Sequence, residues 1–390
     1  MTLLFPSAES LPMLDPVRQE VIALAHTLVV KVGTNVLTGS DGTLDAERVR
    51  SLAEQIWRLR RQGRRVVLVS SGAVGAGVGR MGLPRRPTDL RHLQACAAIG
   101  QCFLMRAYED CLSQHGIPTA QILLTASDFD NRQRYLNARN TIVTLFEWGC
   151  LPIINENDTI SVSEIRFGDN DHLAAMVTNL LQAPLLVILS VVDGLYSADP
   201  RADPTAELLT TVPHLDQHIL DMAGTSRSTL GTGGMLSKLK AARLATAAGE
   251  SVIIANGSRP GILDAICAAE PVGTLFLPHG VTMPAWKRWL GYTARPRGTL
   301  RVDDGAARAV RTQGRSLLPI GITRVSGSFG KGDVVALCDP TGHEFARGLT
   351  NYPSTDIAKI MGLRTEQIAA VLGMVPYEEV VHRDNLVVME

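Results

Sequence analysis

Short apolar runs alternate with longer amphipathic stretches over roughly the first 280 residues. The runs predict strands at residues 28–32, 65–69, 119–123, 151–154, 185–189 and 251–255. Most are apolar throughout rather than at every second position, which is typical of parallel strands covered by helices on both faces. Helical spacing of apolar residues predicts helices at residues 46–62, 89–115, 137–148, 173–181 and 236–248, the first with Asp45 as its N-cap. This alternation predicts a doubly wound α/β domain with a mainly parallel sheet.

The pattern changes near residue 280. Residues 284–298, which are rich in Pro, Gly and basic side chains, read as a linker. Short β-type runs separated by Gly-containing turns follow it, at residues 299–302, 321–325, 333–337 and 343–349. We therefore expect an N-terminal extension over 1–26, loosely ordered up to residue 20, a large α/β domain over 27–283, and a small β-rich domain over 299–390.

Composition narrows the class of protein. Hydrophobic residues make up 45% of the chain, and Lys plus Arg equal Asp plus Glu at 38 each, so there is no net charge. A nucleic-acid-binding domain usually has a basic bias, which argues against nucleic acid as the main partner. The six cysteines form no CxxC pair, as expected of reduced thiols. No signal peptide and no apolar run of about 20 residues is evident, so a soluble cytoplasmic protein without a membrane partner is expected.

Two lysines stand where an uncompensated positive charge is costly. Lys31 lies inside the first apolar run, so it either meets an anion such as phosphate or snorkels to solvent at the strand end. Lys238 falls in the first turn of a predicted helix, where a positive charge opposes the helix dipole. A Gly-rich loop precedes that helix and is suited to nucleotide phosphates. A negative group is expected to compensate Lys238.

Small and polar residues follow several of the predicted strands. Residues 70–77 (SSGAVGAG) let a ligand approach the backbone closely, or are simply a tight connection; they are not a Walker A loop. Carboxylates and amides gather at residues 155–158 and 168–171. They are suited to an ammonium group and a Mg²⁺ shell, or are polar turn residues. Ligands of parallel sheets bind beyond the carboxyl ends of the strands, where these segments fall.

Six segments together resemble the amino acid kinase family, and within it the branch that phosphorylates glutamate. They are residues 28–34 (LVVKVGT), 135–141 (YLNARNT), 154–158 (INEND), 168–171 (GDND), 194–201 (GLYSADPR) and 231–235 (GTGGM). The resemblance extends from residue 28 to about residue 382 and implies a three-layer sandwich with a mainly parallel sheet. Residues 317–322 (LLPIGI) and 330–335 (GKGDVV) resemble a PUA domain.

The resemblance also implies roles for individual residues. Lys31 and Lys238 are expected to contact the ATP phosphates, with Asp171 as the acidic residue that organises them. Ser71, Asp158 and Asn170 are expected to bind glutamate. The expected ATP-binding set is Lys31, Ser190, Val191, Thr232, Gly233, Gly234, Met235, Leu236, Ser237 and Lys238. No metal ligand is assigned.

One position departs from the family pattern. The family has Thr-Asp or Ser-Asp where this chain has Ser190 and Val191, with Asp193 two positions further on. The missing carboxylate is expected to alter ATP affinity or nucleotide preference. It does not change the assignment of the phosphoryl-transfer residues.

The implied reaction is ATP- and Mg²⁺-dependent phosphorylation of the side-chain carboxylate of L-glutamate, the first step of proline biosynthesis. Proline is an expected feedback inhibitor, acting near residues 158–168, and glutamyl phosphate reductase is the expected downstream partner. A homodimer or homotetramer is expected. The alternatives are an acetylglutamate or aspartate kinase, and an RNA-binding protein acting through the PUA-like domain. RNA is disfavoured because few aromatic residues follow residue 298, namely Phe329, Phe345, Tyr352 and Tyr377.

Overall fold

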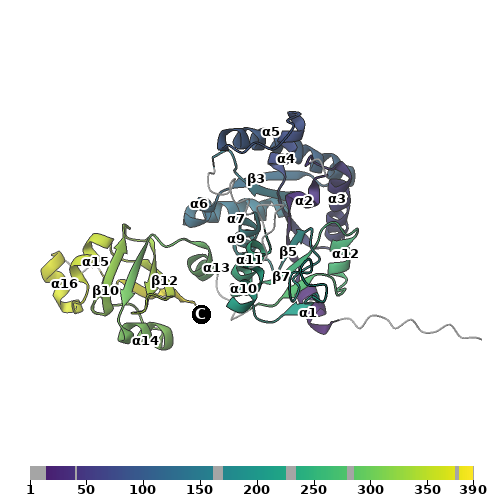
Figure 1. Ribbon diagram of the computed structural model, residues 1–390. Coiled ribbons are helices and arrows are strands. Elements are labelled where there is room, and N and C mark those ends of the chain that lie inside the picture. The colour runs from purple at the N-terminus through teal and green to yellow at the C-terminus, as the bar shows by residue number, and fades with distance from the viewer. Residues whose placement is uncertain are drawn as a thin grey trace, which may run out of the picture. The chain divides into compact units, whose positions relative to one another are not determined.

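The computed structural model describes residues 15–39, 42–160, 170–224, 234–278, 285–373 and 377–389. The chain divides into two compact units (Figure 1). The first consists of Met1–Thr125 and Asn137–Gly280, and the second of Ala126–Leu136 and Val281–Glu390. A short segment from within residues 27–283, the stretch expected to be catalytic, therefore belongs to the second unit.

An eight-stranded sheet forms the centre of the first unit, in the order β3-β4-β2-β1-β5-β7-β8-β6. The strands are β1 (Thr27–Val32), β2 (Arg65–Ser70), β3 (Thr119–Leu124), β4 (Leu151–Glu156), β5 (Leu185–Ser190), β6 (Thr211–Val212), β7 (Ser251–Asn256) and β8 (Thr274–Phe276). Neighbours are parallel except for β7 and β8. The mainly parallel sheet and its six predicted strands are confirmed. The edge strands β6 and β8 span only 2 and 3 residues, too few to give a pattern.

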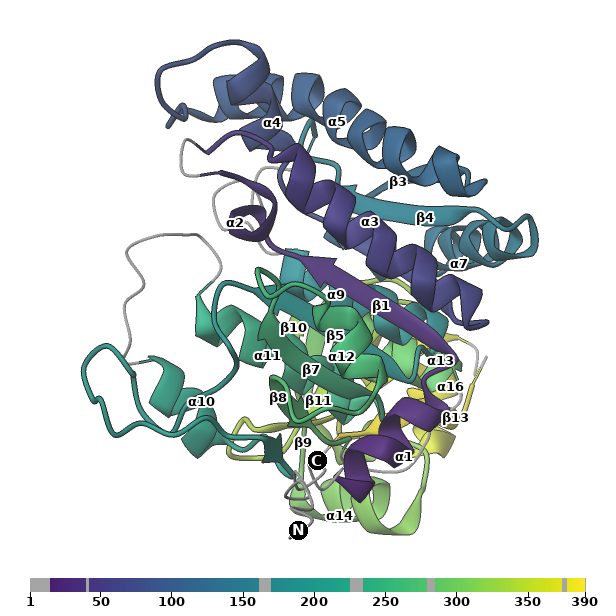
Figure 2. The same cartoon turned by 90° about the vertical axis from the view of Figure 1, so that its right-hand side faces the viewer.

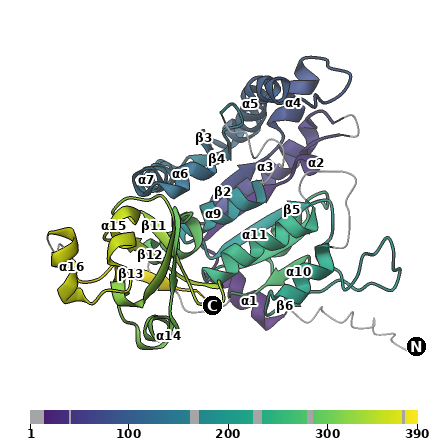
Figure 3. The same cartoon turned by 60° about the vertical axis from the view of Figure 1, so that its left-hand side comes forward.

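Helices cover both faces of this sheet. The helices of the first unit are α2 (Thr34–Leu37), α3 (Ala46–Arg61), α4 (Ala73–Arg80), α5 (Leu90–Leu112), α7 (Arg132–Glu147, whose first residues belong to the second unit), α9 (Asn170–Leu181), α10 (Gln217–Gly224), α11 (Met235–Ala247) and α12 (Ile262–Cys267). Figure 2 shows α3 and α12 in front of one face of the sheet, and Figure 3 shows α9 and α11 side by side over the other. The predicted Asp45 cap is confirmed, because its side chain accepts hydrogen bonds from the first turn of α3.

Side chains of β1 alternate between the two faces, as in any strand. Leu28, Val30 and Val32 belong to one core cluster, together with residues of α3, α5 and α12. The intervening Lys31 therefore points to the opposite face, which α9 and α11 cover. This alternation determines which helices supply its partners.

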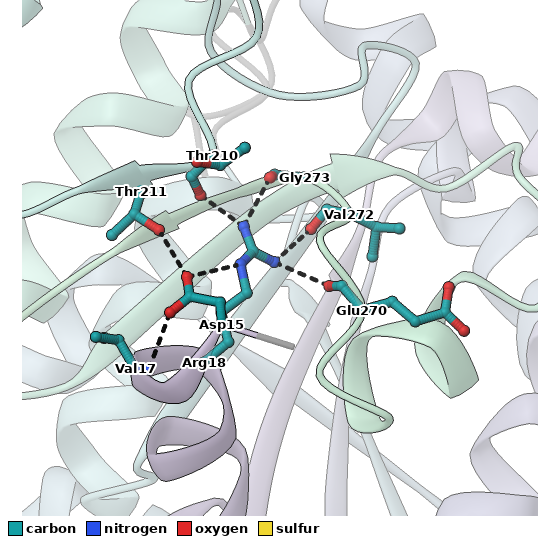
Figure 4. Close-up of polar contacts among 8 residues, drawn as sticks. All are labelled: Asp15, Val17, Arg18, Thr210, Thr211, Glu270, Val272 and Gly273. Carbon is teal, nitrogen blue, oxygen red and sulfur yellow. Dashed lines mark hydrogen bonds and ion pairs between the residues drawn. The ribbon is translucent and has the colours of Figure 1, made fainter. Parts of the chain in front are cut away.

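Before β1, the chain forms helix α1 (Pro16–Leu24), with Pro16 at its first position and Asp15 as its N-cap. The expectation that residues 16–20 are loosely ordered is therefore wrong; residues 1–14 lie outside the described part of the chain. Arg18 has an exposed fraction of only 2%. Its guanidinium donates four hydrogen bonds to main-chain carbonyl oxygens (Figure 4), those of Thr210 (2.6 Å), Val272 (2.7 Å), Gly273 (2.9 Å) and Glu270 (3.3 Å). These carbonyls lie beside β6 and β8, so Arg18 attaches α1 to that edge of the sheet.

The second unit has its own five-stranded sheet, in the order β10-β9-β11-β12-β13. The strands are β9 (Gly298–Val302), β10 (Ile322–Gly327), β11 (Val334–Cys338), β12 (Glu344–Thr350) and β13 (Val381–Val388). The four predicted strands are confirmed, and β13 was missed because polar residues interrupt its apolar pattern. The helical elements are α6 (Ala126–Asp130), α13 (Ala285–Arg288), η2 (Trp289–Thr293), α14 (Asp304–Gln313), η3 (Pro319–Gly321), α15 (Ser354–Ile360) and α16 (Thr365–Leu372). The stretch 284–298, expected to be a linker, thus contains helical turns.

Residues 126–136 are held in the second unit by contacts with η2 and the residues after it. The indole N–H of Trp289 donates to the carbonyl oxygen of Phe129 at 2.7 Å, and the backbone N–H of Arg295 donates to Asp130 at 2.8 Å. The rings of Tyr135 and Trp289 meet edge to face, with centroids 6.3 Å apart. Segments more than 150 residues apart therefore form one packed group.

Candidate active site

Two buried lysines share one buried aspartate beyond the end of β1. The Lys31 ammonium lies 2.6 Å from Asp171 Oδ1, and the Lys238 ammonium lies 3.1 Å from Asp171 Oδ2. The exposed fractions are 4% for Lys31, 5% for Lys238 and 1% for Asp171. Two ammonium groups and one carboxylate give a formal charge of +2 − 1 = +1. The cluster therefore suits an additional anion, as expected of a phosphate site.

Three elements bring this cluster together. Lys31 points from β1 toward the face that α9 and α11 cover, Asp171 lies in the first turn of α9, and Lys238 lies in the first turn of α11. A carboxylate is favourable at a helix N-terminus and a lysine is not. Asp171 thus supplies the negative group that the position of Lys238 requires. Ser237 Oγ donates a further hydrogen bond to Asp171 Oδ2, at 2.9 Å.

Asp171 is held in its charged form. Burial alone raises the pKa of a carboxyl group, but the ammonium groups of Lys31 and Lys238 and the hydroxyl of Ser237 outweigh it and lower the pKa of Asp171 to about 2. The carboxylate is therefore ionised at any pH near neutrality, and it fixes the positions of both lysines.

Asn170, which precedes Asp171 in the sequence, belongs to a cluster of amide side chains. Asn170 Nδ2 donates to Ser71 Oγ at 2.8 Å and to Asn155 Oδ1 at 3.0 Å. Asn155 Nδ2 donates in turn to Gln101 Oε1 at 2.8 Å. The first turn of α9 thus carries both the carboxylate that binds the lysines and the amide that meets Ser71.

The structure brings Ser71 and Asn170 together, two of the three residues expected to bind glutamate. The third, Asp158, is half-buried in the turn after β4, two residues beyond the end of that strand. β4 also carries Asn155, so the turn begins close to the amide cluster. Ser71 stands just after β2 and before Gly72, whose φ of +106° favours glycine.

Gly77, at the end of segment 70–77, and Gly100 of α5 allow two helices to pack closely. A Cβ on Gly77 would lie 1.9 Å from the carbonyl oxygen of Cys96, and a Cβ on Gly100 would lie 1.8 Å from that of Ala73. Helices α4 and α5 therefore approach each other at backbone distance. Gly77 is therefore explained by helix packing and not by contact with a ligand.

Ser190 and Val191, expected on the adenine side, lie at the carboxyl end of β5. The neighbouring β1 ends nearby, because the Gly33 N–H donates to the carbonyl oxygen of Leu189 at 3.2 Å. Val191 is 49% exposed, so no core packing explains the missing carboxylate. Asp193 supplies a carboxylate two residues further on.

Asp193 is held between two strand ends. Its carboxylate accepts hydrogen bonds from Asn256 Nδ2 at 2.9 Å and from the Tyr196 hydroxyl at 3.2 Å. Burial and the nearby Asp193 raise the pKa of Tyr196, so this hydroxyl remains a donor at neutral pH.

The expected phosphate loop is described only from Gly234 onward; Thr232 and Gly233 lie outside the described residues. Gly234 caps the N-terminus of α11 with its backbone extended, and no side chain occupies the cap. Met235, Leu236 and Ser237 form the first turn, a backbone arrangement that suits anions. Lys238 completes this turn, so the four residues lie at the same end of α11.

A pocket of about 420 Å³ between α10 and α11 lies away from this cluster. Its lining residues are Gln217, Leu220, Asp221, Leu236, Lys240 and Arg243. Leu236, Lys240 and Arg243 share one face of α11, since they are four and three residues apart. Lys238 faces nearly the opposite way at about 100° per residue, so the pocket is not part of the lysine–aspartate cluster.

The described residues contain no group of three or more His, Cys, Asp or Glu side chains that could hold a metal ion. Both oxygens of Asp171 already face the lysines. Mg²⁺ is usually bound through substrate phosphates with several waters, so a protein cage is not required. In addition, no helix in the described part of the chain is long and apolar enough to cross a membrane.

Gln101 was missed by the sequence reasoning, and Asn155 was noted only as part of a motif. A signal for Gln101 exists: it lies on the face of α5 that carries the buried residues Ala97, Leu104 and Tyr108. A polar residue on an otherwise apolar helical face marks a buried polar contact.

Comparisons with known proteins identify the family of each part of the chain. The amino acid kinase family matches residues 26–256, and the PUA domain matches residues 298–372. The first match covers more than half of the chain, so the chain belongs to the amino acid kinase family, whose members are phosphotransferases.

Within that family the chain groups with the glutamate 5-kinases. It is 47% identical to glutamate 5-kinase of Pelobacter propionicus, over 95% of this chain and 100% of the relative. It is also 47% identical to that of Syntrophotalea carbinolica, over 95% and 99%, and 48% identical to that of Synechococcus sp. (strain JA-3-3Ab), over 94% and 100%. The predicted kinase and PUA domains are therefore confirmed.

Proposed function

We propose that this chain transfers the γ-phosphoryl group of ATP to the side-chain carboxylate of L-glutamate, forming glutamyl 5-phosphate and ADP. The observation that carries the proposal is the buried cluster of Lys31, Asp171 and Lys238, which retains a formal positive charge. Its glutamate 5-kinase relatives, which align over nearly the whole chain, favour glutamate as the acceptor.

The reaction needs no general base. A glutamate side chain has a pKa of about 4.3, so its carboxylate is already ionised at neutral pH. A carboxylate oxygen attacks the γ-phosphorus, and the bond to the oxygen that bridges to the β-phosphate breaks, leaving its electron pair on ADP. The main difficulty is repulsion between two anions, so positioning and electrostatic stabilisation carry the catalysis.

Lys31 and Lys238 are proposed to stabilise charge on the transferring phosphoryl group, while Asp171 holds both ammonium groups in place. ATP is proposed to enter as its Mg²⁺ complex, with Ser190 and Val191 on the adenine side and residues 232–238 around the phosphates. Mg²⁺ would supply charge neutralisation on the phosphate oxygens.

Ser71, Asp158 and Asn170 are proposed to bind the amino acid. Asn170 and Ser71 offer amide and hydroxyl groups, and Asp158 offers a carboxylate that suits an α-ammonium group. N-acetylglutamate lacks that ammonium group, and aspartate is one methylene shorter. Free glutamate is therefore the proposed acceptor.

Several associated properties follow from membership of the glutamate 5-kinase group and are proposed with it. Proline is proposed as a feedback inhibitor that competes near Asp158. An acyl phosphate is unstable in water, so a glutamyl phosphate reductase is the proposed consumer of the product. The assembly is proposed to be a homodimer or homotetramer, which light scattering on the eluted protein would determine.

The proposal is tested by comparing acceptors. ADP release by the purified chain is measured with Mg-ATP and either glutamate, aspartate or N-acetylglutamate. Glutamate is expected to exceed the other two by at least about 100-fold in kcat/KM, the discrimination expected when a site leaves buried polar groups unpaired with the wrong substrate. Equal or greater turnover with N-acetylglutamate or aspartate would overturn it.

A further inference from the structure

Gln101 lies next to the proposed glutamate site but is absent from the residues expected to act there. It is 8% exposed and stands on α5, and its Oε1 accepts the hydrogen bond from Asn155 Nδ2 at 2.8 Å. Asn155 in turn contacts Asn170, which contacts Ser71. Gln101 therefore stands at the end of a chain of side-chain hydrogen bonds that leads to the substrate residues.

One backbone N–H determines how the side-chain amides of Gln101, Asn155 and Asn170 are oriented. The N–H of Glu156 donates to Asn155 Oδ1 at 2.9 Å, and a backbone N–H is only ever a donor. The Nδ2 of Asn155 must therefore point toward Gln101, and Gln101 must accept this hydrogen bond with its Oε1. By the same reasoning, Asn170 must turn its Nδ2 toward Asn155 Oδ1. The orientation of each amide thus follows from the network rather than from an assumed rotamer.

This arrangement leaves two buried polar atoms without partners in the part of the chain that the structure describes. They are Gln101 Nε2 and Asn170 Oδ1. An unpaired buried donor or acceptor is unfavourable, and such groups in native proteins call for an explanation. Asn170 Oδ1 is an acceptor beside Asp171, where the α-ammonium group of an amino acid would supply the missing donor. Half of the Gln101 amide is unpaired, so a stabilising role alone does not account for this buried residue.

We propose that Gln101 is a positioning residue for the amino acid substrate, acting through Asn155 and Asn170. Its Oε1 holds the Nδ2 end of the Asn155 amide, and the Glu156 N–H holds the Oδ1 end. Asn155 in turn holds the Asn170 side chain with its Oδ1 available to the substrate ammonium group. Without Gln101, Asn155 Nδ2 loses its acceptor. The Asn155 amide is then held only through Oδ1 and positions Asn170 less firmly. This inference rests on the proposed reaction with glutamate.

A matched pair of variants separates positioning from stability. Gln101→Met is expected to raise KM for glutamate about 10-fold, the effect of one lost hydrogen-bond contact, with KM for ATP changed less than threefold. Its Tm is expected to stay close to wild type, because the substitution also removes an unpaired buried donor.

Gln55→Met is the control. Gln55 is 4% exposed, and both halves of its amide are paired, Oε1 with the Leu263 N–H at 2.9 Å and Nε2 with the Ser51 carbonyl oxygen at 3.1 Å. It lies on α3, away from the cluster. This variant is expected to lower Tm and leave KM for glutamate within twofold of wild type.

A double-mutant cycle tests whether Gln101 acts through Asn170. If it does, Gln101→Met combined with Asn170→Ala has the same KM for glutamate as Asn170→Ala alone, within about twofold. Multiplied effects in the double variant, or an unchanged KM in Gln101→Met, would overturn the inference. Wild type is assayed alongside: absence of glutamate-dependent turnover there contradicts the proposed reaction itself, which is a separate outcome.

Discussion

Lys31 and Lys238 each lie in a local environment that is unfavourable for a positive charge. A lysine inside an apolar strand and a lysine in the first turn of a helix are each unfavourable alone. The single carboxylate of Asp171 compensates both. Replacing such a buried ionic group by apolar residues is often neutral or stabilising, so its presence beside the strand ends is better explained by phosphoryl transfer.

Removing either lysine is expected to impair turnover strongly. Lys31→Ala or Lys238→Ala should lower kcat by roughly 10²–10³-fold, the effect of losing one transition-state donor. Lys240→Ala, an exposed residue on the same helix, is the control and should stay within threefold. Steady-state kinetics with glutamate checks both, and a loss below threefold in both active-site variants contradicts the assignment.

Asp171 should make stability depend on pH. Its pKa in the folded protein is about 2, against an ordinary 3.8. A lowered carboxyl pKa contributes stability that is present above the unfolded value and lost as pH falls through the folded value. Asp171→Asn should therefore destabilise the protein by about 3–5 kcal/mol at pH 7, because two lysines stay buried without a counter-charge.

The destabilisation caused by Asp171→Asn should shrink between pH 4 and pH 2. Denaturant unfolding of both proteins across this range measures it. Asp110→Asn, at an exposed surface pair, should change stability by less than about 0.5 kcal/mol throughout. If the difference in free energy of unfolding between wild type and Asp171→Asn stayed constant below pH 4, the assignment of an ionised, buried Asp171 would be contradicted.

At the scale of elements, the local pattern of apolar residues predicted the positions of the strands but not the contacts between distant elements. The central strands are apolar along their whole length because helices cover both faces, and their positions follow from the sequence alone. The partners of Lys31 and the Gln101 contact with Asn155 depend on which strands are neighbours, which no local window contains. Helix α1 was missed although Asp15 and Pro16 are local signals of a helix start. The carbonyls that bind its Arg18, which lie more than 190 residues away, could not be predicted from a local window.

Arg18 should therefore matter more than its place near the chain terminus suggests. Arg18→Ala removes the guanidinium donor from the carbonyl oxygens of Val272 and Gly273, beside β8, and should lower the free energy of unfolding by about 3 kcal/mol. Arg18→Lys should recover little, because an ammonium group cannot span the same set of acceptors. Arg50→Ala, at an exposed pair on α3, should change stability by less than about 0.5 kcal/mol. Equal stability of the Arg18 and Arg50 variants by denaturant unfolding would refute this role.

At the scale of the whole molecule, the two units are not two consecutive stretches of sequence. Residues 126–136 pack with η2 inside the second unit, although they stand between β3 and the rest of α7. The sequence predicted two domains with distinct composition. It did not predict that residues 126–136 belong to the second unit, because Phe129 and Asp130 show no pattern that indicates their distant partners.

Trp289 is the centre of that packing and is 4% exposed. Trp289→Ala should destabilise the second unit by about 3–5 kcal/mol, the usual effect of emptying a buried aromatic site. Trp148→Ala removes an indole that is 72% exposed and should have an effect below about 0.5 kcal/mol. Thermal unfolding followed by tryptophan fluorescence compares the two, and similar losses would contradict the packed group.

The central claim is that the chain phosphorylates the side-chain carboxylate of glutamate, and trapping the product tests it most directly. Purified protein is incubated with Mg-ATP, L-glutamate and hydroxylamine, which converts an acyl phosphate into a stable hydroxamate. The account predicts γ-glutamyl hydroxamate in amounts equal to the ADP released. Formation of ADP without hydroxamate, or of the α-hydroxamate instead, would contradict it.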